Sequence, residues 1–207
     1  MSDHDKLDKQ TRLLAAMAYG ESSTKDVPEE MSALASVLVR QRDARGYSDI
    51  ATFAKSDRTF SFVVADGNAR YKRLMNASES EIAKDPALNA AVSAAKNALS
   101  GGPDLSNGAY FWDGADIKSN YKNHFKVRQG IRFGDSSHNI YSIDESKVLV
   151  IKTKTTIKKK DGKVVDKSVV EVGRYDHVYL STAAHGGTIF WKFNPDYVEL
   201  NHAKEYK

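Results

Sequence analysis

The feature that most restricts the fold of this chain is a change of hydrophobic period near residue 144. Before it, apolar residues recur at helical spacing; after it, short apolar runs alternate with turns, and Asp161-Gly162 is the strongest hairpin signal. Helices first and strands last favour the α+β class. We therefore expect a mainly helical domain over residues 1–142 and an antiparallel, β-hairpin-rich extension over 143–207 packed on it.

Apolar spacing and capping signals divide the helical part into segments. The expected helices cover about residues 6–20, 28–45, 49–55, 68–77 and 86–99. The expected strands begin near residue 147, run on both sides of Asp161-Gly162 as far as Val172, and resume at 178–180 and 188–193.

The residue types present exclude several kinds of site. Cysteine is absent, which rules out disulfides, thiolate zinc sites and a cysteine nucleophile. None of the six histidines stands at i, i+4 from another, and no Gly-x-Ser-x-Gly elbow or phosphate-binding loop is present. We expect no metal site and no cofactor.

The chain contains no run of eighteen apolar residues, and its first residues lack the positive start and apolar core of a secretory signal peptide. We therefore expect a protein that is made in the cytoplasm without a signal peptide and does not insert into membranes.

Positive charge is concentrated in one place. The net charge is +4, and residues 147–167 hold eight lysines against two aspartates. Such a segment could attract an anionic polymer, either nucleic acid or a cell-wall polymer, or it could be a solvated edge that resists aggregation. The sequence leaves these alternatives open.

One carboxylate stands out at the end of the first expected helix. Glu21 shares a helix face with Leu14, Met17 and Ala18, so its side chain lies on the core-facing stripe. Desolvation there favours the protonated form and raises the pKa. Gly20 beside it leaves room for a ligand to approach the backbone. The alternative is that Glu21 lies in an exposed last turn.

Several short motifs occur in an order and spacing that carry more information than each motif alone. They are AYGE (residues 18–21), ASVLVR (35–40), FS (60–61), AKNALSG (95–101), PDLSNGAYF (103–111) and SHNIY (137–141). Over about residues 13–142 the chain resembles cell-wall hydrolases of the spore-cortex-lytic (SleB-like) type. It departs from them in residues 22–26, at Thr59, and in residues 143–207, which have no recognised counterpart.

The resemblance implies a lysozyme-like α+β fold that cuts peptidoglycan glycan strands between N-acetylmuramic acid and N-acetylglucosamine. The family's catalytic glutamate falls on Glu21. The residues that match its cleft and sugar-binding groove are Phe60, Ser61, Tyr110, Phe111 and His138. The resemblance therefore predicts an enzyme with Glu21 as general acid/base.

Two reactions could use Glu21 as the acid. A hydrolase needs a second carboxylate, about 5 Å away to retain configuration or about 6.5–9.5 Å away to invert it. A lytic transglycosylase needs none, because the muramic acid's own 6-hydroxyl closes on the anomeric carbon. The aspartates that could act as partners are Asp57, Asp66, Asp104, Asp113 and Asp116, and no spacing singles one out.

The expected setting is the periplasm or cell wall of a target or host bacterium. We expect a monomer that acts either as an antibacterial effector, with an immunity protein that blocks its cleft, or as a phage lysin, and that does not bind nucleic acid. The competing interpretation is a non-enzymatic module in which the basic hairpin and the aromatic residues bind a glycan or nucleic acid.

Overall fold

The structure is a computed structural model that describes residues 7–56 and 67–206. Phe60, Ser61, Asp57 and Asp66 lie outside the described residues. The helices are α1 (Lys9–Glu21), α2 (Pro28–Ala44), α3 (Ile50–Ser56), α5 (Ala69–Asn76), α6 (Glu79–Lys84), α7 (Pro86–Leu99), α8 (Asp116–Ser119), α9 (Phe125–Gln129) and α10 (Pro195–Asn201), with 3₁₀ turns η3 (Tyr121–Asn123) and η4 (Ser136–His138). The strands are β1 (Phe111–Asp113), β2 (Ile131–Arg132), β3 (Val150–Lys160), β4 (Lys163–Tyr175), β5 (Tyr179–His185) and β6 (Thr188–Phe193).

Helix α1 lies at the centre of the helical layer, where it contacts α2, α5 and α7. Asp8 caps its start by accepting a hydrogen bond from the Thr11 backbone N–H. Leu14 and Met17 are fully buried. The five helices expected from the sequence over this part are confirmed as α1, α2, α3, α5 and α7. The C-terminal end of α1, at Glu21, lies beside Trp112 of β1.

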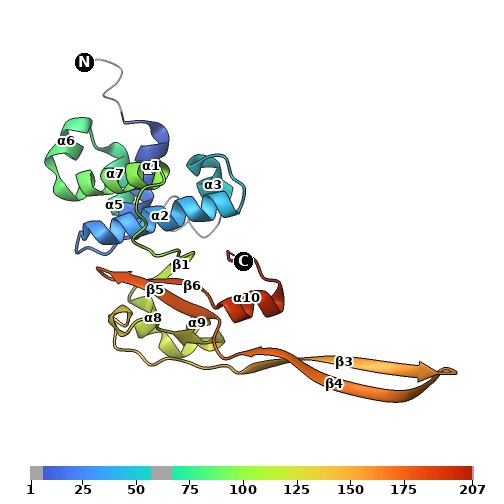
Figure 1. Cartoon of the computed structure of the whole chain (residues 1–207). Coiled ribbons are helices and arrows are strands. Elements are labelled where there is room, and N and C mark those ends of the chain that lie inside the picture. The colour runs from blue at the N-terminus through green and yellow to red at the C-terminus, as the bar shows by residue number, and fades with distance from the viewer. Residues whose placement is uncertain (1–6, 57–66, 207) are drawn as a thin grey trace.

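The sheet has the order β1-β6-β5-β2 and packs below the helical layer (Figure 1). Strand β6 is antiparallel to β1 and β5, whereas the short β2 joins β5 in parallel. The α+β class is confirmed, although the pairing is mixed and not purely antiparallel. Strands from both sides of residue 142 share this sheet, because β1 and β2 precede that point and β5 and β6 follow it.

A buried carboxylate ties the sheet to the helices. Glu30 of α2 is fully buried and accepts hydrogen bonds from the backbone N–H groups of Ser23 and Gly187 and from the hydroxyls of Ser23 and Thr188. A Cβ at Gly186 would clash with this carboxylate, and Gly186 has a positive φ of 59°, which together explain the glycine in the β5–β6 turn. The sheet is thus fixed against α2 near the end of α1.

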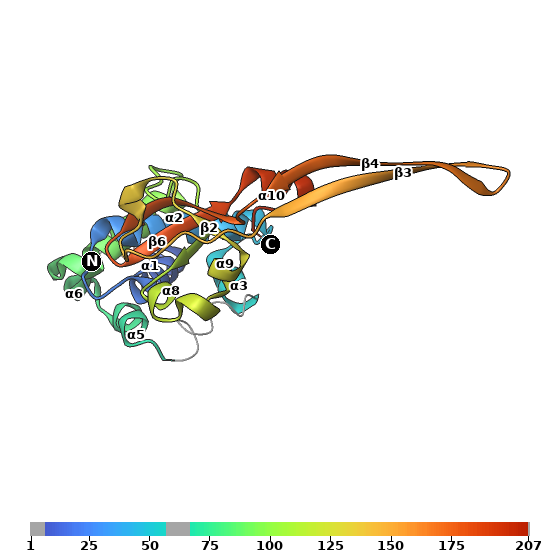
Figure 2. The same ribbon diagram turned by 90° about the horizontal axis from the view of Figure 1, so that it is seen from below.

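Among the described strands, β3 and β4 pair only with each other, and they form a two-stranded arm that projects from the body (Figure 2). The expected hairpin turn at Asp161-Gly162 is confirmed, and both residues have positive φ, 50° and 76°. The strands expected at 178–180 and 188–193 correspond to β5 and β6.

Several short elements were not expected from the sequence. Helix α6 has a capping box between Ser78 and Glu81, and α10 begins at the Asn194 cap before Pro195, both of which are local signals. Strand β1 has no such signal, because three residues are too few to show a period. Among the described residues, no helix has the length and apolar character needed to span a membrane.

Candidate active site

Glu21 is the last residue of α1, and α5 fixes that end of the helix. Arg70 Nε donates a hydrogen bond to the Tyr19 carbonyl at 2.8 Å, and Asn68 Nδ2 donates to the Gly20 carbonyl at 3.0 Å. Carbonyls in the last turn of a helix lack the next turn's N–H groups as partners. The Ser22 hydroxyl also donates to the Tyr19 carbonyl, at 3.0 Å. The Glu21 backbone is therefore held in a defined position.

Strand β1 reaches Glu21 because α2 holds the loop before it. Arg40 Nη1 donates to the Ala109 carbonyl at 2.6 Å and Arg40 pairs with Asp104, while Gln41 donates to the Tyr110 carbonyl. Trp112, next along β1, packs against the helical core. This arrangement brings the indole of Trp112 to the end of α1.

The indole N–H of Trp112 donates to Glu21 Oε2 at 3.3 Å. Burial raises the pKa of the Glu21 carboxyl group from 4.5 to about 7, because desolvation outweighs the opposing effect of the Trp112 hydrogen bond. The raised pKa expected from the helical stripe is confirmed. At neutral pH a substantial fraction of Glu21 can donate a proton.

Glu21 lines a pocket of about 280 Å³ that lies between the helices and β1. The pocket is lined by Glu21, Gln41, Phe111, Trp112, Asp113, Phe125 and Lys126. Phe125 is 53% exposed, which is unusual for a phenylalanine and leaves its ring available at the pocket edge. A carboxylic acid beside exposed and half-buried aromatic rings suits the apolar faces of sugar rings.

A buried ion pair forms one wall of this pocket. Lys126 Nζ donates to both oxygens of Asp113 at 2.7 and 2.8 Å and to the Trp112 carbonyl at 3.2 Å. Burial lowers the pKa of the Lys126 ammonium group, and Asp113 opposes that change. His124 Nε2 lies 3.3 Å from Asp113 Oδ1. The negative charge of Asp113 is therefore neutralised inside the protein.

Asp113 and His124, together with Asp116, form the one group in the described part of the chain that has the spacing of metal ligands. Ligand atoms of Asp113, Asp116 and His124 lie within 4.8 Å of one another. The Lys126 ammonium group, however, already binds both Asp113 oxygens, and a second cation there would be repelled. The arrangement fits an ion-pair network better than a metal site.

The structure brings together only some of the residues predicted from the sequence. Phe111 lines the pocket with Glu21. Tyr110 lies in a separate hollow, where the guanidinium carbon of Arg40 is 5.7 Å from the centre of the tyrosine ring. His138 Nδ1 lies 2.9 Å from the Ser181 hydroxyl, away from the residues that line the pocket. Phe60 and Ser61 lie outside the described residues.

The site residues predicted from the sequence did not include Trp112, Phe125, Lys126 or Gln41, all of which line the pocket. Trp112 directly follows the aromatic motif, so its position in the sequence could have indicated it. Lys126 carries no sequence signal, because a single lysine among many gives no sign that it is buried.

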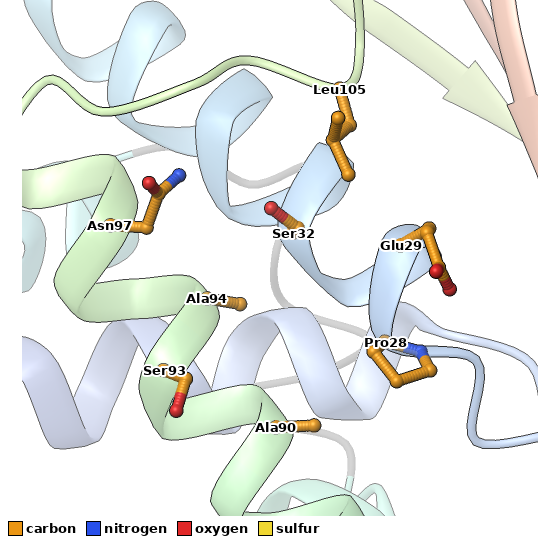
Figure 3. Close-up of a pocket in the computed structure, with 8 residues that line it drawn as sticks. All are labelled: Pro28, Glu29, Ser32, Ala90, Ser93, Ala94, Asn97 and Leu105. Carbon is orange, nitrogen blue, oxygen red and sulfur yellow. The ribbon is translucent and has the colours of Figure 1, made fainter.

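Another hollow, between α2 and α7, has different chemistry from the Glu21 pocket (Figure 3). Small side chains such as Ala90, Ser93 and Ala94 line most of it, and Glu29 is its only carboxylate among the described lining residues. Glu29 is exposed in the first turn of α2. The hollow lacks the buried acid that distinguishes the Glu21 pocket.

No family model, no curated protein and no solved structure matches the chain. The function is therefore inferred from the residues of the site.

Proposed function

We propose that the protein cleaves the glycan strands of peptidoglycan, between N-acetylmuramic acid and N-acetylglucosamine, with Glu21 as general acid/base. The observation that carries this proposal is a carboxyl group with a pKa raised to about 7 in a pocket lined by aromatic side chains. Cleavage of a glycosidic bond requires an acid that is still protonated near neutral pH, and a raised pKa meets that requirement.

Asp113 favours the transglycosylase route over hydrolysis. It is the other carboxylate among the described residues that line the pocket, but both its oxygens are bound by Lys126. A carboxylate neutralised in this way stabilises a positive sugar intermediate poorly and makes a poor nucleophile. Asp104 is likewise held by Arg40, so Glu21 is the working acid among these three carboxylates.

In the proposed reaction, the Glu21 carboxyl group transfers its proton to the glycosidic oxygen as the bond from that oxygen to the anomeric carbon breaks. The 6-hydroxyl oxygen of the muramic acid then bonds to the anomeric carbon. Its proton passes to the Glu21 carboxylate, which restores the acid for the next cycle.

Mass spectrometry of fragments released from purified sacculi tests this function. We expect muropeptides with 1,6-anhydro ends, each lighter by one water than a hydrolysis product. Reducing ends that take up oxygen from isotopically labelled water would instead show a lysozyme-type hydrolase. If the wild-type protein releases no glycan fragments, the proposed function is wrong.

The exposed ring of Phe125 provides a second test. We expect Phe125→Ala to raise KM for soluble glycan chains about fivefold with little change in kcat, because stacking on the sugar holds substrate in ground and transition states alike. Phe125→Trp should keep KM near the wild-type value. Leu105→Ala, which removes an exposed apolar side chain outside the pocket, serves as the control. An unchanged KM in Phe125→Ala would exclude a stacking role.

A further inference from the structure

The two-stranded arm is not explained by the proposed reaction. Residues 153–172 are exposed on both faces, and the arm carries most of the basic segment seen in the sequence. A lone two-stranded ribbon is only marginally stable in water. Its length and charge therefore call for a role beyond packing.

The pairing register places most of the arm's lysines on one face, whereas Lys159, opposite Val164, and Lys167, opposite Ile157, lie on the other. Directly paired residues lie side by side and successive residues alternate between faces. Lys154 pairs with Val170, Lys158 with Asp166, and Lys160 with Lys163. We call the side that carries Lys154, Lys158, Lys160 and Lys163 the lysine face. From Lys154 to Lys160 it extends about 20 Å.

Most of this charge has no partner on the arm. Lys158 lies 3.4 Å from Asp166, but across the described part of the chain Lys154, Lys160 and Lys163 have no carboxylate within ion-pair distance. Lys160 and Lys163 are directly opposite each other, which destabilises the ribbon. Stability of the arm alone does not account for these lysines.

Protection of exposed strand edges against aggregation explains the lysines of the arm only in part. The strand that most needs protection is β4, which carries the exposed valines at 164, 165, 169, 170 and 172. The lysines instead cluster on β3, at 152, 154, 158, 159 and 160, with two on β4 at 163 and 167. Their placement follows one face of the arm more closely than it follows the aggregation-prone strand.

The lysine face fits a linear polyanion. Lysine is depleted at the centres of protein interfaces, where aromatic side chains are enriched, and residues 150–174 contain no aromatic residue. Stacking on nucleic acid bases also requires aromatic side chains. A row of flexible ammonium groups matches repeated carboxylates without reading a sequence or a shape.

We infer that the lysine face of the arm binds the carboxylates of peptidoglycan stem peptides and retains the enzyme on the sacculus. This inference rests on the proposed function, because it takes the enzyme's own polymeric substrate as the ligand. Attraction to an extended polyanion raises the local concentration of substrate and weakens as salt screens the charges.

Sedimentation with purified sacculi over a series of salt concentrations tests the arm. Every protein carries Glu21→Gln so that binding is measured without digestion. Lys154, Lys158, Lys160 and Lys163 are changed together to Gln; we expect retention at low salt to fall about tenfold and its salt dependence to flatten. The same four positions changed to Arg should retain binding.

The matched control changes four exposed lysines of the helical layer to Gln, which alters net charge equally: Lys9, Lys72, Lys84 and Lys96. Its retention should fall no more than about twofold. Equal losses in the arm and control variants, or no loss in the arm variant, would overturn the inference.

The ligand is tested separately. Sacculi whose carboxylates have been amidated should retain the protein with its four arm lysines no better than they retain the protein in which those lysines are Gln. Undiminished retention of the protein with its arm lysines would exclude carboxylates as the ligand. Arm-dependent binding to sheared DNA that is as strong as binding to sacculi would overturn the assignment to wall polymer. Cleavage of soluble glycan chains by protein with an intact Glu21 tests the proposed function independently, because that reaction does not require the arm.

Discussion

Glu21→Gln is expected to reduce glycan cleavage by about a thousandfold, because a general acid typically contributes 10²- to 10⁴-fold to a rate and glutamine cannot donate a proton. The amide keeps the shape of the side chain, so the pocket and the Trp112 contact should persist. Release of muropeptides from sacculi measures the loss. Glu29→Gln, the same change at an exposed carboxylate, should keep wild-type activity.

The substitution that lowers activity should raise stability at high pH. The pKa of Glu21 is about 7 in the folded protein and about 4.5 in the unfolded chain, so the folded state binds a proton more tightly. As pH rises from 4.5 to 7 the native protein must give up this proton, and stability is lost. The loss reaches up to about 3 kcal/mol above pH 7.

Glu21→Gln does not undergo this loss of stability, because glutamine has no carboxyl group to deprotonate. Compared with the wild type, it should therefore be relatively more stable at pH 8 than at pH 4, as measured by denaturant unfolding at both values. Cleavage by the wild type should fall as pH rises through about 7, because the proton donor is lost. Wild-type activity in Glu21→Gln would refute the assignment of the acid.

Asp113→Asn is expected to destabilise the fold by about 3–5 kcal/mol, because it leaves the buried Lys126 ammonium group without a counter-charge. The change should also displace β1, since Lys126 binds the Trp112 carbonyl as well. Denaturant unfolding measures the free energy of unfolding.

Two further variants sharpen this test. Asp116→Asn removes an exposed carboxylate near His124, which also lies beside Asp113. It should change the free energy of unfolding by less than about 0.5 kcal/mol. Asp113→Asn combined with Lys126→Met should recover much of the lost stability, because no buried charge then remains unpaired. If Asp113→Asn costs no more than Asp116→Asn, the ion pair does not support the site.

The five helices α1, α2, α3, α5 and α7 could be predicted because their signals are local. The apolar spacing in α2, the Pro28 start and the Asp85 cap of α7 lie within a few residues of the structure they produce. The Asp161-Gly162 turn is equally local. The helical stripe also indicated that Glu21 would be desolvated, since residues three, four and seven positions apart share a face.

The surroundings of Glu21 could not be predicted in the same way. Trp112 lies 91 positions along the chain from Glu21, and Lys126 contacts Asp113 from a different element. Neither contact leaves a periodic trace in the sequence. His138 shows the converse: its motif suggested a place near the groove, but in the structure it contacts Ser181 of β5.

By itself, the sequence determined five of the helices, the hairpin turn and the desolvated position of Glu21, because these depend on residues that are neighbours along the chain or one helical turn apart. The tertiary structure alone decided that β1 would lie beside β6, with Trp112 at Glu21 and a neutralised Asp113 in the same pocket. The physical reason is that these contacts join distant segments whose meeting depends on how the helical layer packs on the sheet.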